Sequence, residues 1–344
     1  MLHELIADRR ETISHHFEGI PVRSSFVRHP LDPALWCVDS DVSVEDPEGG
    51  DQWFTGHAAS SDRDAAMRRS CWEIIERLAA TRLVQGEAQA RSGWRVRSVF
   101  GDEDRGVVQA SDVLVREESG GRRGPSASGL GAHTVRQEAI RHGLMELIER
   151  HMLMRWWYEG APPLVRLRSE PLPDGFRIDY LTSVDAVPFA LAVLRDDDDT
   201  MIFCGSAVRT DLADAEAHAR EECMHLSTNY LVHRHFDGDS GAASLTGNVA
   251  STIARIALLR GPVACAMLAH LDRCSISRTV SGPKIADARC IAEIALGDAE
   301  HLTYARLGRW QARLEIIRVL SDRALSKHAA RRRASPDHVT DPFC

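Results

Sequence analysis

Two short stretches of the sequence repeat the same charged pattern inside apolar runs. They are "WEIIERL" at residues 72–78 and "MELIERH" at residues 145–151, and both contain Glu-x-x-Glu-Arg. In a helix this spacing places two carboxylates side by side on one face. Two neighbouring carboxylates repel each other unless a cation or a proton lies between them. Because clustered oxygen ligands favour Mg²⁺, which commonly bridges to phosphate oxygens, the pattern predicts a site for a divalent cation and a phosphate-containing ligand.

A third stretch keeps the same register around Glu222. In each unit, small residues lie three and seven positions before a glutamate, and a glycine lies seventeen positions before it. The units are Gly56, Ala66, Ser70 and Glu73; Gly129, Ala139, Gly143 and Glu146; and Gly205, Ala215, Ala219 and Glu222. These steps place the small residues on the same helix face as the glutamate. We therefore predict three units of strand, glycine loop and helix, in which the glycine forms a tight entry turn and the helix N-terminus is available to an anion.

An ordinary structural explanation stands beside this one. Glu73 with Arg77, and Glu146 with Arg150, have the i,i+4 spacing that adds roughly 0.2–0.5 kcal/mol to an exposed helix. The second helix, however, is apolar around its glutamates, so we expect it to be largely buried, and buried carboxylates need compensating partners. The third unit differs, because His225 takes the place of the second glutamate. The alternative interpretation is therefore that the three units are a structural repeat with no catalytic or binding role.

The composition narrows the class of protein. The chain has 344 residues, 44% of them hydrophobic, and a net charge of −8. These values indicate a globular protein and argue against non-specific nucleic-acid binding. No apolar run approaches the ~20 residues that span a bilayer, and none of the eight cysteines forms a Cys-x-x-Cys pair. We therefore expect a cytoplasmic protein with reduced thiols, without nucleic-acid or membrane partners.

Histidine pairs offer a weaker metal signal. His15 with His16, and His233 with His235, lack a third ligand at a fixed spacing. Surface or helix-end positions are therefore expected for them, in preference to a zinc site.

The elements that must position the glutamates follow from the apolar pattern. Helices are predicted over residues 62–85, 135–158 and 214–231, and strands over 35–38, 53–56, 94–100 and 106–117. Residues 42–52 are predicted to form a loop, and residues 187–209 a β-hairpin. The predicted fold class is α+β with mixed sheets, in one domain over residues 1–344. Residues 231–325 are expected to form a helical C-terminal part, and residues 326–344 a polar tail.

Three longer stretches resemble the signatures of the YcaO family in order and spacing, within residues 53–230. They are "GHAASSDRDAAMRRSCWEIIER", "SASGLGAHTVRQEAIRHGLMELIERHMLMRWW" and "GSAVRTDLADAEAHAREECMH". The resemblance implies an enzyme that uses ATP and Mg²⁺ to phosphorylate the oxygen of a peptide backbone amide after a nucleophile has attacked the carbonyl. With Cys, Ser or Thr as the nucleophile the product is an azoline, whereas other members make thioamides or amidines.

The resemblance also assigns site residues, although no catalytic residue is assigned. The implied Mg²⁺ ligands are Glu73, Glu76, Glu146 and Glu149. The implied ATP contacts are Ser70, Arg77, Thr134, Glu138, Arg150, His218 and Glu222.

Several positions depart from the pattern that is common in the family. Thr134 stands in place of Asn, His218 of Arg, His225 of Gln, His151 of Asp and His57 of Lys. A protonated histidine can meet phosphate, but its charge depends on pH. These departures favour the alternative of a non-catalytic subunit that binds a peptide or a partner enzyme, whereas the retained glutamate pairs favour an enzyme.

The ends of the sequence bear on the substrate and on partners. Azoline-forming members commonly end in Pro-x-Pro-x-Pro, whereas this chain ends in "SPDHVTDPFC". The stretch before Trp53 is too short for a leader-binding domain of the usual size. We therefore expect a precursor peptide as substrate and a leader-binding or E1-like partner protein, in the biosynthesis of a ribosomally made peptide such as a thiazole- or oxazole-containing antibiotic. A homodimer is also compatible with the sequence.

Overall fold

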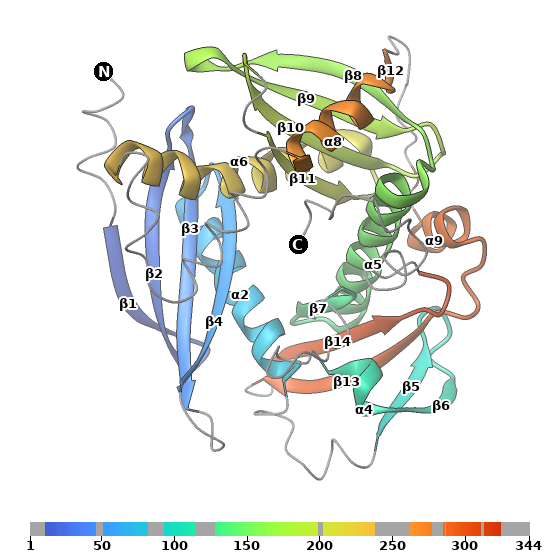
Figure 1. Ribbon diagram of the computed structural model, residues 1–344. Coiled ribbons are helices and arrows are strands. Elements are labelled where there is room, and N and C mark those ends of the chain that lie inside the picture. The colour runs from blue at the N-terminus through green and yellow to red at the C-terminus, as the bar shows by residue number, and fades with distance from the viewer. Residues whose placement is uncertain are drawn as a thin grey trace.

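The computed structural model describes residues 11–45, 51–81, 93–114, 128–198, 202–237, 262–276, 285, 287–310 and 313–324. Within these residues, three mainly antiparallel sheets lie around three long helices, α2 (Arg63–Ala79), α5 (Arg136–Glu159) and α6 (Leu212–Asp237). Figure 1 shows the sheets at the left, the top and the lower right, with the helices between them.

The first sheet is a meander with the strand order β1-β2-β3-β4. Its strands are β1 (Glu11–Phe17), β2 (Ile20–His29), β3 (Asp32–Glu45) and β4 (Asp51–Ser60). The second sheet has the order β6-β5-β13-β14-β7. Its strands are β5 (Trp94–Ser98), β6 (Asp104–Val108), β7 (Leu130–His133), β13 (Thr303–Trp310) and β14 (Leu314–Leu320).

The third sheet has the order β11-β10-β9-β8-β12, in which only β12 runs parallel to its neighbour. Its strands are β8 (Leu164–Pro171), β9 (Phe176–Ser183), β10 (Phe189–Asp196), β11 (Ile202–Val208) and β12 (Ser275–Ile276). The shorter helices are α4 (Ala110–Val113), η1 (Pro173–Gly175), α8 (Pro262–Asp272) and α9 (Ala288–Leu296). No helix among the described residues is long and apolar enough to cross a membrane.

Each long helix packs between two different sheets, and we call α2, α5 and α6 the junction helices. Helix α2 contacts β3 and β4 of the first sheet and β7 and β13 of the second. Helix α5 contacts β7 and β14 of the second sheet and β11 of the third, and α6 contacts β10 and β11 of the third sheet and β2, β3 and β4 of the first. The three sheets and three helices therefore form a closed ring.

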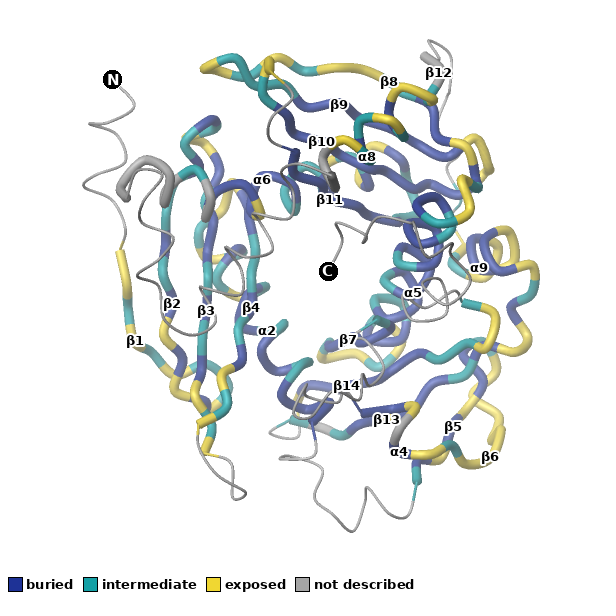
Figure 2. Tube along the Cα trace, viewed as in Figure 1, coloured by how far each residue is buried: buried dark blue, intermediate teal, exposed yellow. Residues whose placement is uncertain are grey.

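Strand β10 shows how the ring is filled, because it is buried on both faces (Figure 2). Leu191 and Val193 belong to the apolar cluster that includes the buried face of α5. Ala190 and Ala192 belong to the cluster that includes Ala219 of α6. Since successive side chains of a strand point to opposite faces, one strand supports two junction helices.

Glycine explains how closely the helices approach their strands. A Cβ atom added at Gly56 would overlap the carbonyl oxygen of Ser70, and one added at Gly205 would overlap that of Ala219. In the second unit, a Cβ atom added at Gly143 would overlap the carbonyl oxygen of Gly129, and one added at Gly131 would overlap that of Ala139. The small residues of the repeat therefore accommodate the strand of their own unit. The prediction that glycine forms an entry turn is wrong at Gly56 and Gly205, which lie inside β4 and β11.

The structure confirms the three predicted helices and the hairpin, which is the antiparallel pair β10 and β11, although α2 ends at Ala79, before its predicted end, and α6 extends beyond its predicted end to Asp237. Helix α2 begins where expected, because the side chain of Asp62 accepts the N–H of Ala65 at 2.9 Å. The predicted loop at residues 42–52 is wrong at its ends: β3 continues to Glu45 and β4 begins at Asp51, while residues 46–50 lie outside the described residues. The predicted tail, residues 326–344, also lies outside them.

The predicted helical C-terminal part is wrong in its last section, where the chain forms the hairpin of β13 and β14. Residues 314–319 of β14 form a fully buried run that includes the charged Glu315 and Arg318, so the run lacks the apolar–polar alternation of a half-exposed strand. Such a run fits a helix or a buried strand equally well. Ile316, Ile317 and Val319 are β-branched, which favours a strand once both faces are covered.

Candidate functional site

The first glutamate of two units is held by the strand of its own unit. Glu73 accepts the backbone N–H of His57 at 2.6 Å, and Glu222 accepts the backbone N–H of Ser206 at 2.8 Å. Both donors immediately follow the close-packed glycine, Gly56 or Gly205. The glycine contact therefore brings a backbone donor within reach of the carboxylate.

The residue three positions after this glutamate contacts a strand of the next sheet in the ring. Glu76 of α2 accepts the backbone N–H of Ala132 in β7 at 2.8 Å. Glu149 of α5 accepts the hydroxyl of Ser206 in β11 at 2.8 Å. The equivalent residue of α6 is His225, whose Nε2 lies 2.9 Å from Asp39 in β3 of the first sheet. Each junction helix is thus linked to the next sheet of the ring by one of these side chains: Glu76, Glu149 or His225.

The glutamates of the three helices are near enough to act on one another electrostatically. Burial raises the pKa of Glu146 to about 8; Arg150 opposes this shift, while Glu76 and Glu73 add to it. Burial and Glu73 raise the pKa of Glu76 to about 7. Each raised pKa means that the charged form lacks compensation in the protein alone.

The third helix contributes to the same group of carboxylates. Burial and Glu149 raise the pKa of Glu222 to about 7. Burial also raises the pKa of Glu149, against the favourable charge of Arg150. The side chains of Glu73 and Glu222 nevertheless keep 29% and 38% of their exposed area, so solvent reaches part of the group. We call Glu73, Glu76, Glu146, Glu149 and Glu222 the carboxylate cluster.

Two arginines balance part of this charge. Arg77 donates to Glu73 at 2.5 Å and to the carbonyl oxygen of Thr55 at 2.6 Å. Arg150 extends to Glu222 of α6 at 4.0 Å. Burial disfavours the charged form of Arg150, but Glu149 and Glu222 outweigh it and raise its pKa above the usual value. The guanidinium group of Arg150 therefore stays charged beside the carboxylates.

The other predicted ATP contacts lie in different surroundings. Ser70 is fully buried, and its hydroxyl lies 2.7 Å from that of Ser40. Thr134 is exposed between β7 and α5, and Glu138 pairs with Arg141 at 2.8 Å. His218 lies 3.2 Å from the carboxylate of Asp214 on the outer part of α6. ATP contacts for Ser70, Thr134, Glu138 and His218 stay predictions.

The histidines that depart from the family pattern separate into two groups. His151 is buried and bonds the carbonyl oxygen of Ala295 in α9 at 3.1 Å, which ties two core helices together. His57 and His225 share one partner, because Nδ1 of His57 lies 2.8 Å from the same oxygen of Asp39 that His225 contacts. Only the second group adjoins the carboxylate cluster.

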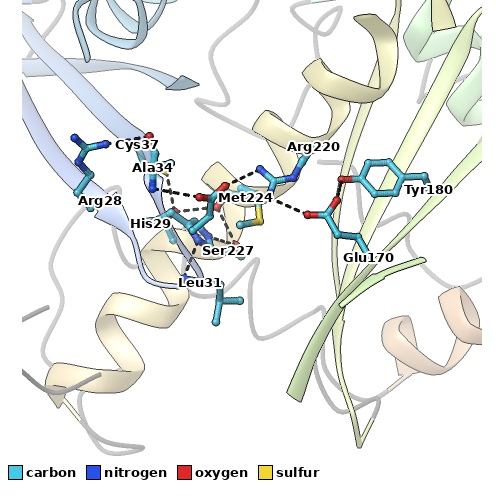
Figure 3. Close-up of polar contacts among 12 residues, drawn as sticks. Arg28, His29, Leu31, Ala34, Cys37, Glu170, Tyr180, Arg220, Met224 and Ser227 are labelled. Atoms are coloured by element: carbon cyan, nitrogen blue, oxygen red, sulfur yellow. Dashed lines mark hydrogen bonds and ion pairs between the residues drawn. The ribbon is translucent and has the colours of Figure 1, made fainter. Parts of the chain in front are cut away.

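A network of polar contacts fixes α6 between its two sheets (Figure 3). Arg220 donates to Asp32 at 2.9 Å and to Glu170 of β8 at 3.2 Å. His29 of β2 bonds the hydroxyl of Ser227 at 3.0 Å. These contacts flank Glu222 and His225 on the helix and so hold both in place.

Sequence reasoning did not identify Ser206 and Asp39. Ser206 follows the glycine of the third unit, as His57 follows that of the first, so the repeat carries a signal for it. Asp39 lies outside all three units and has no such signal. It becomes visible only because β3 pairs with β4, which places Asp39 opposite His57.

The donor set of the carboxylate cluster fits magnesium. Mg²⁺ takes carboxylate oxygens and shares phosphate oxygens. A divalent cation would also favour the charged forms of Glu76, Glu146 and Glu222, whose pKa values are raised mainly by burial and further by neighbouring carboxylates.

Comparisons with known proteins match part of the chain to a family model. Residues 115–265 match a family model described as a YcaO cyclodehydratase that binds ATP and Mg²⁺. A search of curated protein sequences finds no match. The matched segment contains Glu146, Glu149 and Glu222, whereas Glu73 and Glu76 precede it.

Solved structures of similar fold agree with this match. YcaO from Methanopyrus kandleri, bound with AMPPCP and Mg²⁺, has a TM-score of 0.59 and 15% identity, over 92% of this chain and 89% of that one. The E. coli microcin synthetase McbBCD complex has a TM-score of 0.61 and 13% identity, over 90% of each chain. A heterocyclase in complex with substrate and cofactor has a TM-score of 0.59 and 13% identity, over 86% of this chain. This chain spans about half the length of that heterocyclase, 48% of which it covers.

Residues 115–265 thus match the YcaO cyclodehydratase family model, and the fold of the chain is similar to that of a solved YcaO protein. This family binds ATP and Mg²⁺.

Proposed function

We propose that this protein uses ATP and Mg²⁺ to phosphorylate the oxygen of a peptide backbone amide, and that its product is an azoline in a ribosomally made peptide. The observation that carries the proposal is the carboxylate cluster, to which all three junction helices contribute. Several carboxylates at one place are costly without cations, and phosphoryl transfer is a reaction that uses such cations.

The reaction suits these residues. A Cys, Ser or Thr side chain attacks the preceding amide carbonyl, and the amide oxygen then takes the γ-phosphoryl group of ATP, releasing ADP. Loss of phosphate carries that oxygen away and leaves a C=N bond, while the nucleophile and the amide nitrogen each give up a proton. Phosphoryl transfer needs positioning and charge neutralisation more than covalent help from the protein.

The site residues have proposed roles in this scheme. Glu73, Glu76, Glu146 and Glu149 hold Mg²⁺, which neutralises the triphosphate when bound. Arg77 and Arg150 lie beside these carboxylates and orient them or meet phosphate oxygens. Glu222 shares Ser206 with Glu149 and so sets the position of the third helix in the site.

Partners are proposed by analogy with the similar structures. The microcin synthetase is a complex, a second structure of it has pro-MccB17 bound, and the heterocyclase structure contains a substrate. We therefore propose a precursor peptide as substrate and a separate protein that helps to recognise it. Thioamide or amidine formation on the same activated amide is the alternative reaction, which the mass change of the product distinguishes.

A non-catalytic subunit is the second candidate, and a specific observation favours it. His57 and His225 adjoin the carboxylate cluster at positions where the family commonly has Lys and Gln. Isothermal titration with ATP and Mg²⁺ separates the two candidates, because a scaffold should give no metal-dependent heat of nucleotide binding.

Glu146→Gln tests the catalytic proposal. The variant keeps the size of the side chain and removes a carboxyl group whose pKa is already raised to about 8, so it should fold normally. We expect ATP-dependent phosphate release to be abolished while the midpoint of thermal unfolding is unchanged or higher. Phosphate release is measured with the complete assembly of protein, peptide and partner.

Glu159→Gln is the matched control, because Glu159 lies at the end of the same helix and pairs with Arg155 at 3.3 Å. It should keep full activity. Normal phosphate release by Glu146→Gln would refute the proposed role of the cluster.

A further inference from the structure

The contact that α6 makes with the first sheet differs chemically from the corresponding contacts of α2 and α5. Glu76 and Glu149 link their junctions through carboxylates, whereas His225 occupies the equivalent position in α6 and reaches Asp39. His57 joins them from β4. Where α6 meets the first sheet, the contact therefore consists of two imidazoles and one carboxylate. In α2 and α5 the corresponding contact is a glutamate that accepts from a backbone N–H or a hydroxyl group.

The three side chains converge on one point. Oδ1 of Asp39 lies 2.8 Å from Nδ1 of His57 and 2.9 Å from Nε2 of His225. All three potential ligand atoms lie within 4.8 Å of one another. The imidazole rings are 5.1 Å apart between centroids, so both present a nitrogen to the same carboxylate.

The backbone holds this arrangement from three elements. Asp39 and His57 are directly opposite in the β3–β4 ladder, which fixes their separation. His225 is buried, with 7% of its side chain exposed, while Asp39 and His57 keep 24% and 35%. A ligand could therefore enter from the side of the two strands and meet a rigidly placed imidazole behind it.

The carboxylate of Asp39 is held in its charged form by its two imidazole partners. Burial opposes the charge of Asp39, but hydrogen bonds from His225 and His57 outweigh this effect and hold its pKa well below the ordinary value. One oxygen of Asp39 accepts hydrogen bonds from both imidazoles. A single metal ion could therefore take the place of the two shared protons.

We propose that Asp39, His57 and His225 bind a late first-row divalent metal ion, with Zn²⁺ preferred, at a site separate from the Mg²⁺ of the carboxylate cluster. The proposal does not depend on the proposed function, because a non-catalytic subunit would carry the same site. Its metal would join α6 to the first sheet and keep a coordination position open for water or another group.

The ligand types decide the choice of metal. Mg²⁺ prefers oxygen in an octahedral arrangement, whereas imidazole nitrogen suits Zn²⁺ and its neighbours. Two histidines and a carboxylate, with a fourth position left open, are a known zinc arrangement. Ligand atoms around tetrahedral Zn²⁺ lie about 3.3 Å apart for bonds of about 2.0–2.1 Å. The present separations of 2.8 and 2.9 Å need to open only slightly once the shared protons leave.

Cobalt substitution tests the site in the full-length protein. The protein is freed of metal with a chelator and titrated with Co²⁺ in the presence of excess Mg²⁺, and the visible ligand-field bands are recorded. We expect one Co²⁺ per chain, displaced by one equivalent of Zn²⁺. Asp39→Asn, which keeps the shape of the side chain, and His225→Ala should each weaken Co²⁺ binding at least about tenfold, the lower end of the cost of losing a ligand's supporting partner.

Matched controls separate this site from other cation sites. Asp41→Asn lies two residues along the same strand, at a carboxylate paired with Arg23, and should leave the bands unchanged. Glu149→Gln alters the carboxylate cluster and should also leave them unchanged. Zn²⁺ should raise the unfolding midpoint of the wild type and of Asp41→Asn, but not of Asp39→Asn. Absence of Co²⁺ bands in the wild type, or equal bands in Asp39→Asn and His225→Ala, would overturn the proposal and leave a hydrogen-bonded triad.

Discussion

Ser206 holds two carboxylates of the cluster through two different groups. Its hydroxyl donates to Glu149 and its backbone N–H donates to Glu222, each at 2.8 Å. A side-chain substitution therefore removes one of the two bonds and keeps the other. This separation allows the contribution of the hydroxyl to be measured alone.

Ser206→Ala should weaken binding of Mg²⁺ in the presence of ATP. Loss of a hydrogen bond to a charged group costs about 1.5–3 kcal/mol, which corresponds to about 10- to 100-fold in affinity. Burial already raises the pKa of Glu149, and the variant should raise it further. Titration calorimetry measures the affinity.

Ser183→Ala is the matched control, because Ser183 is buried in the same sheet and its hydroxyl accepts the N–H of Asp185. Equal Mg²⁺ affinity in Ser206→Ala and the wild type would show that Glu149 takes no part in metal binding.

Residue types in a repeated register were enough to predict that the glutamates lie together. The repeat places each glutamate on the face of small residues, and that face must meet the rest of the protein. The partners of the glutamates were not predictable in the same way. Asp39 reaches the site through the pairing of β3 with β4, and Ala132 through the packing of β7 against α2, and neither contact is marked by the repeated register.

At the scale of elements, the glycine contacts set the distance between strand and helix. Gly205 has ordinary backbone angles, so its lack of a side chain serves close packing against α6 and not an unusual conformation. The same holds for Gly56 against α2.

Gly205→Ala should therefore push β11 away from α6 and destabilise the protein by about 1–3 kcal/mol, the usual cost of overpacking. The added methyl group would overlap the backbone of Ala219 and Cys223, which cannot move aside as a flexible side chain can. Urea denaturation followed by circular dichroism measures the change.

Gly101→Ala provides the comparison, because its added Cβ would meet only the movable carboxylate of Glu103 on the surface. It should change the free energy of unfolding by less than about 0.5 kcal/mol. Similar destabilisation by both variants would contradict the packing explanation for Gly205.

Elements with a local signal were predictable and the others were not. Asp62 marks the start of α2, and Gly160, with φ of 66°, ends α5 within one or two residues of the predicted boundary. The first sheet was largely missed, because its strands are short of continuous apolar residues and rich in charge. Strand β14 was missed for the opposite reason, since burial on both faces removes the alternation that identifies a strand.

At the scale of the whole molecule, His29 links the first sheet to α6. It is buried and bonds Ser227 at 3.0 Å, and burial lowers its pKa to about 3 against the opposing charge of Asp32. Arg220 and His225 also face it and lower the pKa further. The folded protein therefore keeps this imidazole neutral.

The free energy of unfolding should fall as the solution becomes acidic. Below about pH 6.5 the unfolded chain binds a proton at His29 that the folded protein does not take up until about pH 3. The contribution is complete above pH 6.5 and is lost progressively below it, by about 2 kcal/mol between pH 7 and pH 5. His29→Gln should show a correspondingly shallower dependence in urea denaturation, and identical slopes for the two proteins would contradict the assignment.

The closed ring of sheets and junction helices has a consequence for dynamics. Because every junction helix serves two sheets, no sheet can swing away without disturbing two helices and hence two sets of glutamates. A cation–nucleotide complex that spans the helices should therefore slow amide hydrogen exchange in α2, α5 and α6 together, by a common factor. Protection confined to one helix would mean that the ring opens locally and that its segments undergo opening fluctuations independently of one another.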